Sequence, residues 1–162
     1  IISSKTASLF SASCFIGASL SNASTMHSES LRQFGTDIGM AFQIIDDISD
    51  FYPDSGPGKE AGSDLQNLIP TLPAIYFLNN DSSCPRPELV DFITNPDVLP
   101  ADKLRRLGQA GAIEMSCRKA RAYADSALDT LETLPPTDSK TQLQNFTLSL
   151  IQKTDAFEAR VS

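Results

Sequence analysis

The sequence predicts an all-α protein, and three observations support that fold class. Between the breaks in the chain, apolar residues recur at steps of three and four, which is the spacing of one helix face. No run alternates convincingly between apolar and polar residues, as a half-buried strand would. The breaks are rich in Gly, Pro, Asn and Ser, such as the stretch "PDSGPGKEAGS" at 53–63. With 162 residues, the chain is expected to be a single domain with a buried core.

The first predicted helix covers residues 2–18 and is apolar nearly all round, which is typical of a buried helix. It starts without a capping residue, so we expect it to be a core helix of a larger structure. It also lacks an initiator Met, a basic n-region and a convincing cleavage site, and we therefore do not interpret it as a targeting segment. No stretch approaches ~20 uninterrupted apolar residues, so no membrane-spanning helix is expected.

The second predicted helix runs from about 26 to 51, with Ser24 or Thr25 as its N-cap. It contains Gly35 and Gly39, which fall on one face. Glycine costs a helix about 1 kcal/mol relative to alanine. Close packing against another helix or a ligand is the expected compensation.

The rest of the chain is expected to hold three short helices and two long ones, separated by breaks that contain proline. After a turn at 64–68, these helices are, in order, one starting near Pro70 and Pro73, one at about 88–94, one reaching about Gly108 with Asp102 in its first turn, an amphipathic helix at 110–134, and a last helix starting at Ser139 or Thr141. The amphipathic helix has the clearest apolar face, made of Ala112, Met115, Ala120, Tyr123, Ala127, Leu128 and Leu131.

Composition and charge narrow the function classes. The net charge of −7 and the low isoelectric point argue against a general nucleic-acid binder, which would carry a basic face. The three cysteines, Cys14, Cys84 and Cys117, are far apart and form no CxxC pair. We therefore expect reduced thiols and a cytoplasmic location, rather than a disulfide framework or a zinc site.

The feature that carries chemistry is a cluster of three acids late in the second helix. Asp46 and Asp50 are one helical turn apart, with Asp47 beside them. Like charges at this spacing destabilise a helix by roughly 0.2–0.5 kcal/mol for each pair, and the helix dipole adds to the cost at a C-terminal end. Two interpretations stay open from these residues alone. They are either surface acids at a helix end or oxygen ligands for a hard cation such as Mg²⁺.

The neighbourhood of the acids offers further candidates for binding. Gln43 lies one turn before Asp47, and Lys59 sits in a glycine-rich loop, from which a lysine can reach a phosphate. Each candidate also has a plainer interpretation. Lys59 is then an ordinary loop lysine, Phe42 a core residue, and Lys5 a lysine whose stem lies along an apolar helix. The lone His27 is expected to be solvated.

The segments "GMAFQIIDDISDF", "GKEAGSDL" and "PTLPAIYFL" closely resemble the second aspartate-rich motif region of the trans-isoprenyl diphosphate synthases. "KTASLF" is similar to the family's Lys-Thr element, and "GAIEMSCRKARAYADSALDTLETLP" to a late family helix. The resemblance implies the C-terminal half of an isoprenoid-synthase helical bundle over residues 1–162. It also implies a Mg²⁺-dependent prenyltransferase that joins isopentenyl diphosphate to an allylic diphosphate and releases diphosphate.

The resemblance also implies roles for individual residues. Asp46 is the principal metal carboxylate, and Asp47 and Asp50 contribute further metal contacts or bind metal-bound water. Lys5 and Lys59 hold diphosphate oxygens. The remaining implied substrate-pocket residues are Thr6, Gln43 and Phe42, with Asp64 near the lysine.

The chain departs from the family pattern because it carries only one aspartate-rich motif. The arginine pair that normally follows the first motif is absent, and Arg105 and Arg106 lie too far downstream to replace it. The residues that set product length lie mainly beside the first motif and are also missing. We therefore expect a partner chain or a missing N-terminal half to supply that motif. The alternative is a non-catalytic regulatory or scaffolding subunit of a heteromeric synthase.

Overall fold

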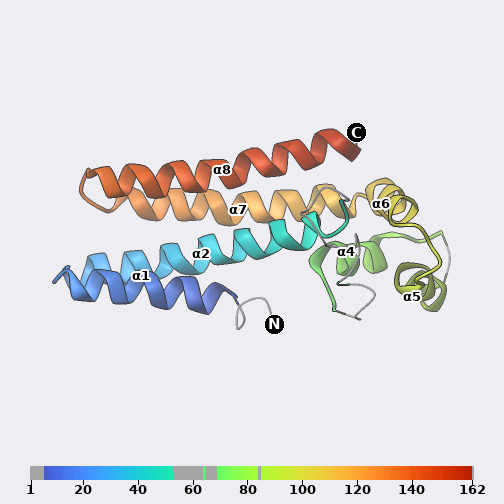
Figure 1. The fold of residues 1–162 in the computed structure, drawn as a ribbon, viewed down its shortest axis with the longest axis horizontal. Helices are drawn as coiled ribbons and strands as arrows, with labels where there is room; N and C mark the ends of the chain where they lie inside the picture. The colour runs from blue at the N-terminus through green and yellow to red at the C-terminus, as the bar shows by residue number, and fades with distance from the viewer. Residues whose placement is uncertain (1–5, 53–63, 65–68, 84, 162) are drawn as a thin grey trace. The chain divides into compact units, whose positions relative to one another are not determined.

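The computed structural model describes residues 6–52, 64, 69–83 and 85–161. Within these residues the chain forms helices and no strand (Figure 1), which confirms the all-α prediction. The helices are α1 (Ser8–Leu20), α2 (Thr25–Ser49), α4 (Leu72–Asn80), α5 (Arg86–Thr94), α6 (Pro100–Gln109), α7 (Ala112–Glu132) and α8 (Asp138–Val161). Lys5, Lys59, Cys84 and the predicted loop at 53–63 lie outside the described residues, as does most of the turn at 64–68.

The helix boundaries agree closely with the sequence prediction where both are described. α2 begins one residue earlier and ends two residues earlier than expected, and α8 begins at Asp138, one residue before the predicted Ser139. The Ser24 hydroxyl accepts the backbone N–H of His27 at 3.2 Å, so Ser24 caps α2 as predicted. Cys14 and Cys117 are free thiols. In the part of the chain described here, no helix combines the length and apolar character needed to cross a bilayer.

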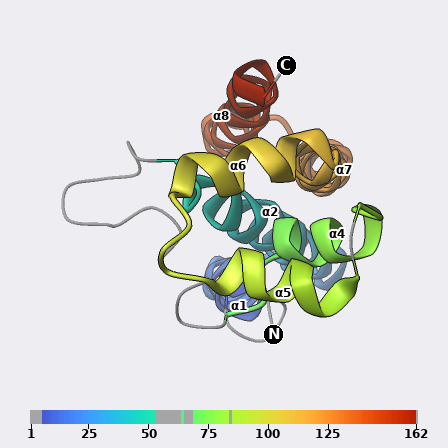
Figure 2. The same ribbon diagram turned by 90° about the vertical axis from the view of Figure 1, so that its right-hand side faces the viewer.

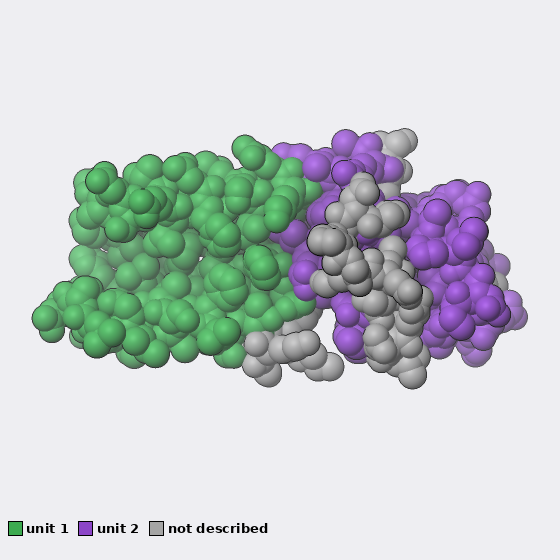
Figure 3. All heavy atoms as spheres, viewed as in Figure 1, with its two compact units in different colours: residues 1–43, 119–154 green, residues 44–118, 155–162 purple. Residues whose placement is uncertain are grey.

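The chain divides into two compact units, coloured separately in Figure 3. Unit 1 comprises residues 1–43 and 119–154, and unit 2 comprises residues 44–118 and 155–162. The single domain expected over residues 1–162 stays a prediction.

Unit 1 is a set of helices running alongside one another, formed by α1, most of α2, and parts of α7 and α8 (Figure 1). Its core includes Phe34 and Ile38 from α2 and Leu131 from α7, each nearly fully buried. The buried Asp37 accepts hydrogen bonds from Ser126 at 2.9 Å and Gln33 at 3.1 Å. This polar link between α2 and α7 satisfies a carboxylate that would otherwise be costly inside the unit.

The two glycines of α2 face α1 at very short range, as the sequence predicted. A Cβ on Gly35 would stand 2.6 Å from the carbonyl oxygen of Phe10, and a Cβ on Gly39 would stand 2.7 Å from the Cα of Ala7. The Ser11 hydroxyl adds a 3.0 Å hydrogen bond to the carbonyl of Arg32. The α1–α2 contact therefore depends on the absence of side chains on one face of α2.

One apolar face of α1 is exposed, as expected for a core helix of a larger structure. Leu9, Ile16 and Leu20 are 65%, 55% and 80% exposed. They follow one another at steps of seven and four, which places them on one side of the helix. Within unit 1 the glycine-lined face of α2 covers only the opposite side of α1, so an apolar stripe remains exposed.

Unit 2 contains α4, α5 and α6 (Figure 2). The ring of Phe77 in α4 contacts that of Phe92 in α5, with centroids 6.2 Å apart. The Arg106 guanidinium of α6 lies over both rings, 4.6 Å from Phe92 and 5.6 Å from Phe77. The rings therefore form an aromatic platform for the cation. The C-terminal turns of α8 add Phe157, whose ring stacks on Tyr52 at 4.9 Å.

Candidate functional site

The C-terminal end of α2 presents its three acids in different environments. Asp46 is exposed, whereas Asp47 and Asp50 are only 5% and 6% exposed. The sequence spacing groups Asp46 with Asp50, but the structure groups Asp50 with Asp47. The helix ends at Ser49, so the surroundings of Asp50 are set by the chain that follows as well as by α2.

Each buried acid accepts a hydrogen bond from a backbone amide that is distant in sequence. The Asp47 Oδ2 accepts the N–H of Leu72 at 3.2 Å, and the Asp50 Oδ2 accepts the N–H of Asp64 at 3.0 Å. Hydrogen bonds to an ionised acceptor are stronger than neutral ones. The two carboxylates therefore hold the backbone on both sides of the 65–68 segment.

The start of α4 explains why Asp47 accepts a hydrogen bond from the backbone of Leu72. Thr71 occupies the N-cap position with an extended backbone, but its side chain makes no capping hydrogen bond. Its hydroxyl is buried and has no hydrogen-bond partner among the described residues. Pro73 has no N–H to satisfy. The N–H of Leu72 is one of the donors that a helix leaves unpaired at its start, and Asp47 binds it from α2.

A second pair of predicted site residues meets in unit 1. The Thr6 hydroxyl donates a short hydrogen bond to the side-chain carbonyl oxygen of Gln43, which joins the residues before α1 to α2. The Phe42 ring lies 5.6 Å from that of Phe10 and remains 37% exposed. The structure thus brings Thr6 and Gln43 together and leaves Phe42 at the edge of the α1–α2 packing.

The acids do not form a metal cage by themselves. Among the residues that the structure describes, no group of three or more His, Cys, Asp or Glu side chains is arranged to hold a metal ion. Mg²⁺ commonly takes one or two carboxylates, several waters and substrate phosphate oxygens, and such a site needs no preformed cage. The exposed carboxylate of Asp46 fits that kind of site.

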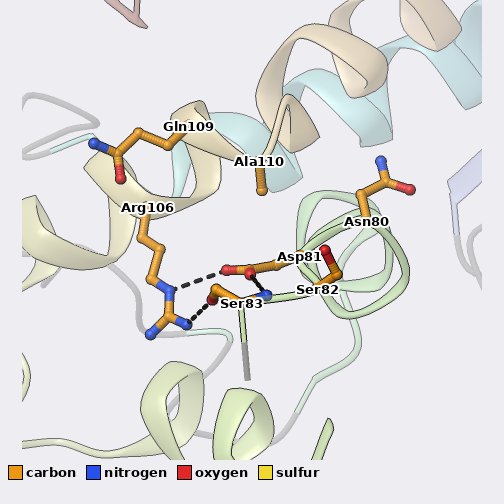
Figure 4. A pocket seen from close by; sticks show the side chains of 7 residues that line it. All are labelled: Asn80, Asp81, Ser82, Ser83, Arg106, Gln109 and Ala110. Carbon is orange, nitrogen blue, oxygen red and sulfur yellow. Dashed lines mark hydrogen bonds and ion pairs between the residues drawn. The ribbon is translucent and has the colours of Figure 1, made fainter. Parts of the chain in front are cut away.

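A pocket of about 360 Å³ in unit 2 was not anticipated from the sequence (Figure 4). It is lined by Asn80, Asp81, Ser82, Ser83, Arg106, Gln109 and Ala110. Arg106 donates to Asp81 at 3.0 Å and to Ser83 at 2.9 Å. Its charge is therefore used to tie α6 to the segment after α4, and we assign the pocket a structural role. The partners are 25 and 23 residues apart, so no local signal reveals them.

Comparison with known proteins decides the family. The family model for polyprenyl synthetase matches residues 1–106. The chain belongs to the polyprenyl synthetase family. It is 33% identical over 153 residues to a probable mitochondrial hexaprenyl pyrophosphate synthase of Yarrowia lipolytica, covering 92% of this chain and 33% of the relative. It is 36% identical over 135 residues to heptaprenyl diphosphate synthase component 2 of Bacillus subtilis, covering 83% of this chain and 38% of the relative.

Solved structures of polyprenyl synthetases agree with this assignment. A geranylgeranyl pyrophosphate synthase from Corynebacterium glutamicum, complexed with calcium and isoprenyl diphosphate, matches with a TM-score of 0.80 and 31% identity. The match covers 94% of this chain and 48% of that one. A decaprenyl diphosphate synthase from Rhodobacter capsulatus matches with a TM-score of 0.82 and 25% identity, covering 94% of this chain and 48% of that one. The chain thus has the fold of about half of a polyprenyl synthetase.

Proposed function

We propose that this chain is the metal-binding and diphosphate-binding half of a trans-prenyltransferase that joins isopentenyl diphosphate to an allylic diphosphate. The observation that carries the proposal is the exposed carboxylate of Asp46, held at the end of α2 between buried neighbours in a polyprenyl synthetase fold. One exposed carboxylate is enough to bind a Mg²⁺ ion whose remaining coordination positions are filled by water and diphosphate oxygens.

The proposed reaction is electrostatic catalysis of leaving-group departure. The allylic carbon–oxygen bond breaks with its electron pair on the diphosphate, the double bond of isopentenyl diphosphate forms the new carbon–carbon bond, and a proton is lost. Mg²⁺ bound at Asp46 would offset negative charge on the diphosphate. Lys5 and Lys59 would hold diphosphate oxygens as point charges, and the oxygens of Thr6 and Gln43 would face the developing carbocation.

The metal role of Asp46 draws support from the comparison with the Corynebacterium structure, which contains calcium and an isoprenyl diphosphate. Mg²⁺ as the ion for this chain is part of the proposal. The predicted metal contacts of Asp47 and Asp50 stay predictions, and so does the role of Asp64 near Lys59.

We also propose that the first aspartate-rich motif is supplied by a partner chain or by another part of a longer protein. The chain spans between about a third and a half of the length of the curated relatives it matches. Two of these relatives, from Bacillus subtilis and Geobacillus stearothermophilus, are named component 2 of heptaprenyl diphosphate synthase. The exposed apolar stripe of α1 is a suitable contact surface for the missing helices.

A cytoplasmic location belongs to the same proposal. Related proteins carry both mitochondrial and chloroplastic names, so the compartment has to be tested by fractionation of cells that express the chain.

The test is turnover of labelled isopentenyl diphosphate with an allylic diphosphate and Mg²⁺ by the complete assembly that contains this chain. Asp46→Asn is expected to lower kcat/KM by roughly 10²–10³, the loss seen when one group that stabilises transition-state charge is removed. Asp129→Asn removes an exposed acid from α7 and is the matched control. Unchanged turnover in Asp46→Asn would refute the catalytic proposal and favour the regulatory or scaffolding subunit.

A further inference from the structure

The two buried acids of the aspartate-rich cluster have a task that differs from that of Asp46. Asp47 and Asp50 are almost fully buried, and each directs one carboxylate oxygen at a backbone amide of the chain that follows α2. Each of these two carboxylate oxygens therefore already accepts a hydrogen bond from the protein's own backbone. Asp46 is the acid whose position on the helix leaves it exposed to solvent.

The start of α4 supplies the charge that compensates Asp47. A helix carries the equivalent of roughly half a positive charge at its N-terminus, concentrated on the unpaired N–H groups of the first turn. Asp47 binds the first of these, the N–H of Leu72, at 3.2 Å. The N-cap residue Thr71 does not compete, because its buried hydroxyl makes no capping bond. Part of the repulsion within the cluster is therefore offset by α4.

The consequence is a mechanical link between α2 and α4. The Asp47 bond spans 25 residues and the Asp50 bond spans 14, so both close segments of chain onto the last turns of α2. These turns carry Asp46. Burial of Ile45 and Ile48 also holds this end of α2, so loss of the links is expected to loosen the last turn and the start of α4 rather than to unfold the helix.

We propose that Asp47 is a positioning residue that anchors the start of α4 to the end of α2 and thereby fixes Asp46, with Asp50 anchoring the backbone of Asp64 in the same way. The inference rests on the proposed function of Asp46. It assigns Asp47 to the protein's own backbone, where the family resemblance alone implies a contact to the metal or to metal-bound water.

The test compares substitutions at Asp47 and Asp46 in the complete assembly, with two readouts. The first is the Mg²⁺ concentration that gives half-maximal turnover, measured together with kcat. The second is hydrogen exchange of the Leu72 amide. Asp47→Ala is expected to speed Leu72 exchange on the order of tenfold or more, as fits loss of a charge-assisted hydrogen bond. It should lower kcat and raise the Mg²⁺ requirement by clearly less than Asp46→Asn does, since Asp46 is displaced but its carboxylate is still present.

Asp47→Asn is the conservative variant, because its amide oxygen can still accept the Leu72 N–H. Compared with Asp47→Ala, it should retain most of the protection of the Leu72 amide and most of the wild-type kcat. It also keeps the proposal testable if Asp47→Ala fails to fold. Asp46→Asn is the contrast. It should raise the Mg²⁺ requirement at least tenfold while Leu72 exchange stays at the wild-type rate.

A metal ligand at Asp47 would give a different pattern. If Asp47→Asn raised the Mg²⁺ requirement as much as Asp46→Asn did, with Leu72 still protected, the positioning role would be overturned. It would also be overturned if Asp47→Ala left Leu72 exchange unchanged. Faster Leu72 exchange in Asp47→Ala, combined with full activity of Asp46→Asn, would instead refute the proposed function and leave the anchor in place.

Discussion

Gly35→Ala tests the packing of α1 on α2 most directly. The added Cβ would lie 2.6 Å from the carbonyl oxygen of Phe10 and 2.7 Å from the Cα of Ser11, and both are backbone atoms that cannot rotate away. Ordinary contacts of a Cβ begin at 3.4 Å. The two helices must therefore separate by about 0.8 Å (3.4 − 2.6), a displacement that forfeits a quarter to a half of each dispersion contact along the interface.

The expected destabilisation follows from two opposing terms. Overpacking of a well-packed interior costs typically about 1–3 kcal/mol, and the clash with backbone places Gly35→Ala near the upper end. Replacing glycine by alanine within a helix returns about 1 kcal/mol. The net loss in free energy of unfolding is thus about 2 kcal/mol, which lowers Tm by roughly 4–8 °C in a protein of this size.

Gly17→Ala in α1 provides the matched control. A Cβ at Gly17 meets nothing within 4 Å, so only the gain in helix propensity remains, about 1 kcal/mol in favour of the folded state. Urea unfolding followed by circular dichroism should therefore place the two variants on opposite sides of the wild type. If Gly35→Ala were as stable as Gly17→Ala, the close approach of α1 and α2 would be refuted.

Two further predictions concern pH. Hydrogen bonds from Ser83, assisted by Arg106, hold the pKa of Asp81 below its ordinary value of 3.8, so this stabilisation is present above pH 3.8 and is lost as the pH falls through the lower folded value. The difference in free energy of unfolding between wild type and Asp81→Asn should shrink below pH 3.8, and a constant difference down to pH 2 would contradict the assignment. Burial raises the pKa of Tyr52 from 10.0 to about 12, so its contribution to stability is complete below pH 10 and is lost towards pH 12. The tyrosinate absorbance of Tyr52 can be measured as the difference between wild type and Tyr52→Phe, and it should appear near pH 12. If it appeared near pH 10 instead, the phenol would not be buried against Phe157.

Local sequence determined the helices and much of their packing. Apolar spacing predicted α7 closely, and Ala112, Ala120, Ala127 and Leu131 of its predicted face are all buried. The paired glycines of α2 predicted a close contact, because only a helix interface or a ligand compensates for glycine in a helix interior. Both signals lie within a few residues of the feature they specify.

The sequence also singled out the acids at the end of α2, since three like charges in an apolar run need a compensating partner. What it did not provide is the environment of each acid. Spacing groups Asp46 with Asp50, whereas burial groups Asp50 with Asp47. The donors at Leu72 and Asp64 decide this difference, and their separation from α2 in sequence leaves no local pattern to read.

Tertiary structure likewise decided which side of the apolar helix α1 is covered and which residues Arg106 hydrogen-bonds. The composition of α1 indicates burial, but burial requires neighbours on every side, and Leu9, Ile16 and Leu20 have none among the described residues that covers them. Arg106 is tied to Asp81 and Ser83 by contacts across more than 20 residues. The sequence by itself therefore determined the helices, the family and the acidic cluster, because these depend on neighbouring residues. The fold alone decided which carboxylate faces solvent and which faces remain exposed, because those depend on what long-range packing brings into contact.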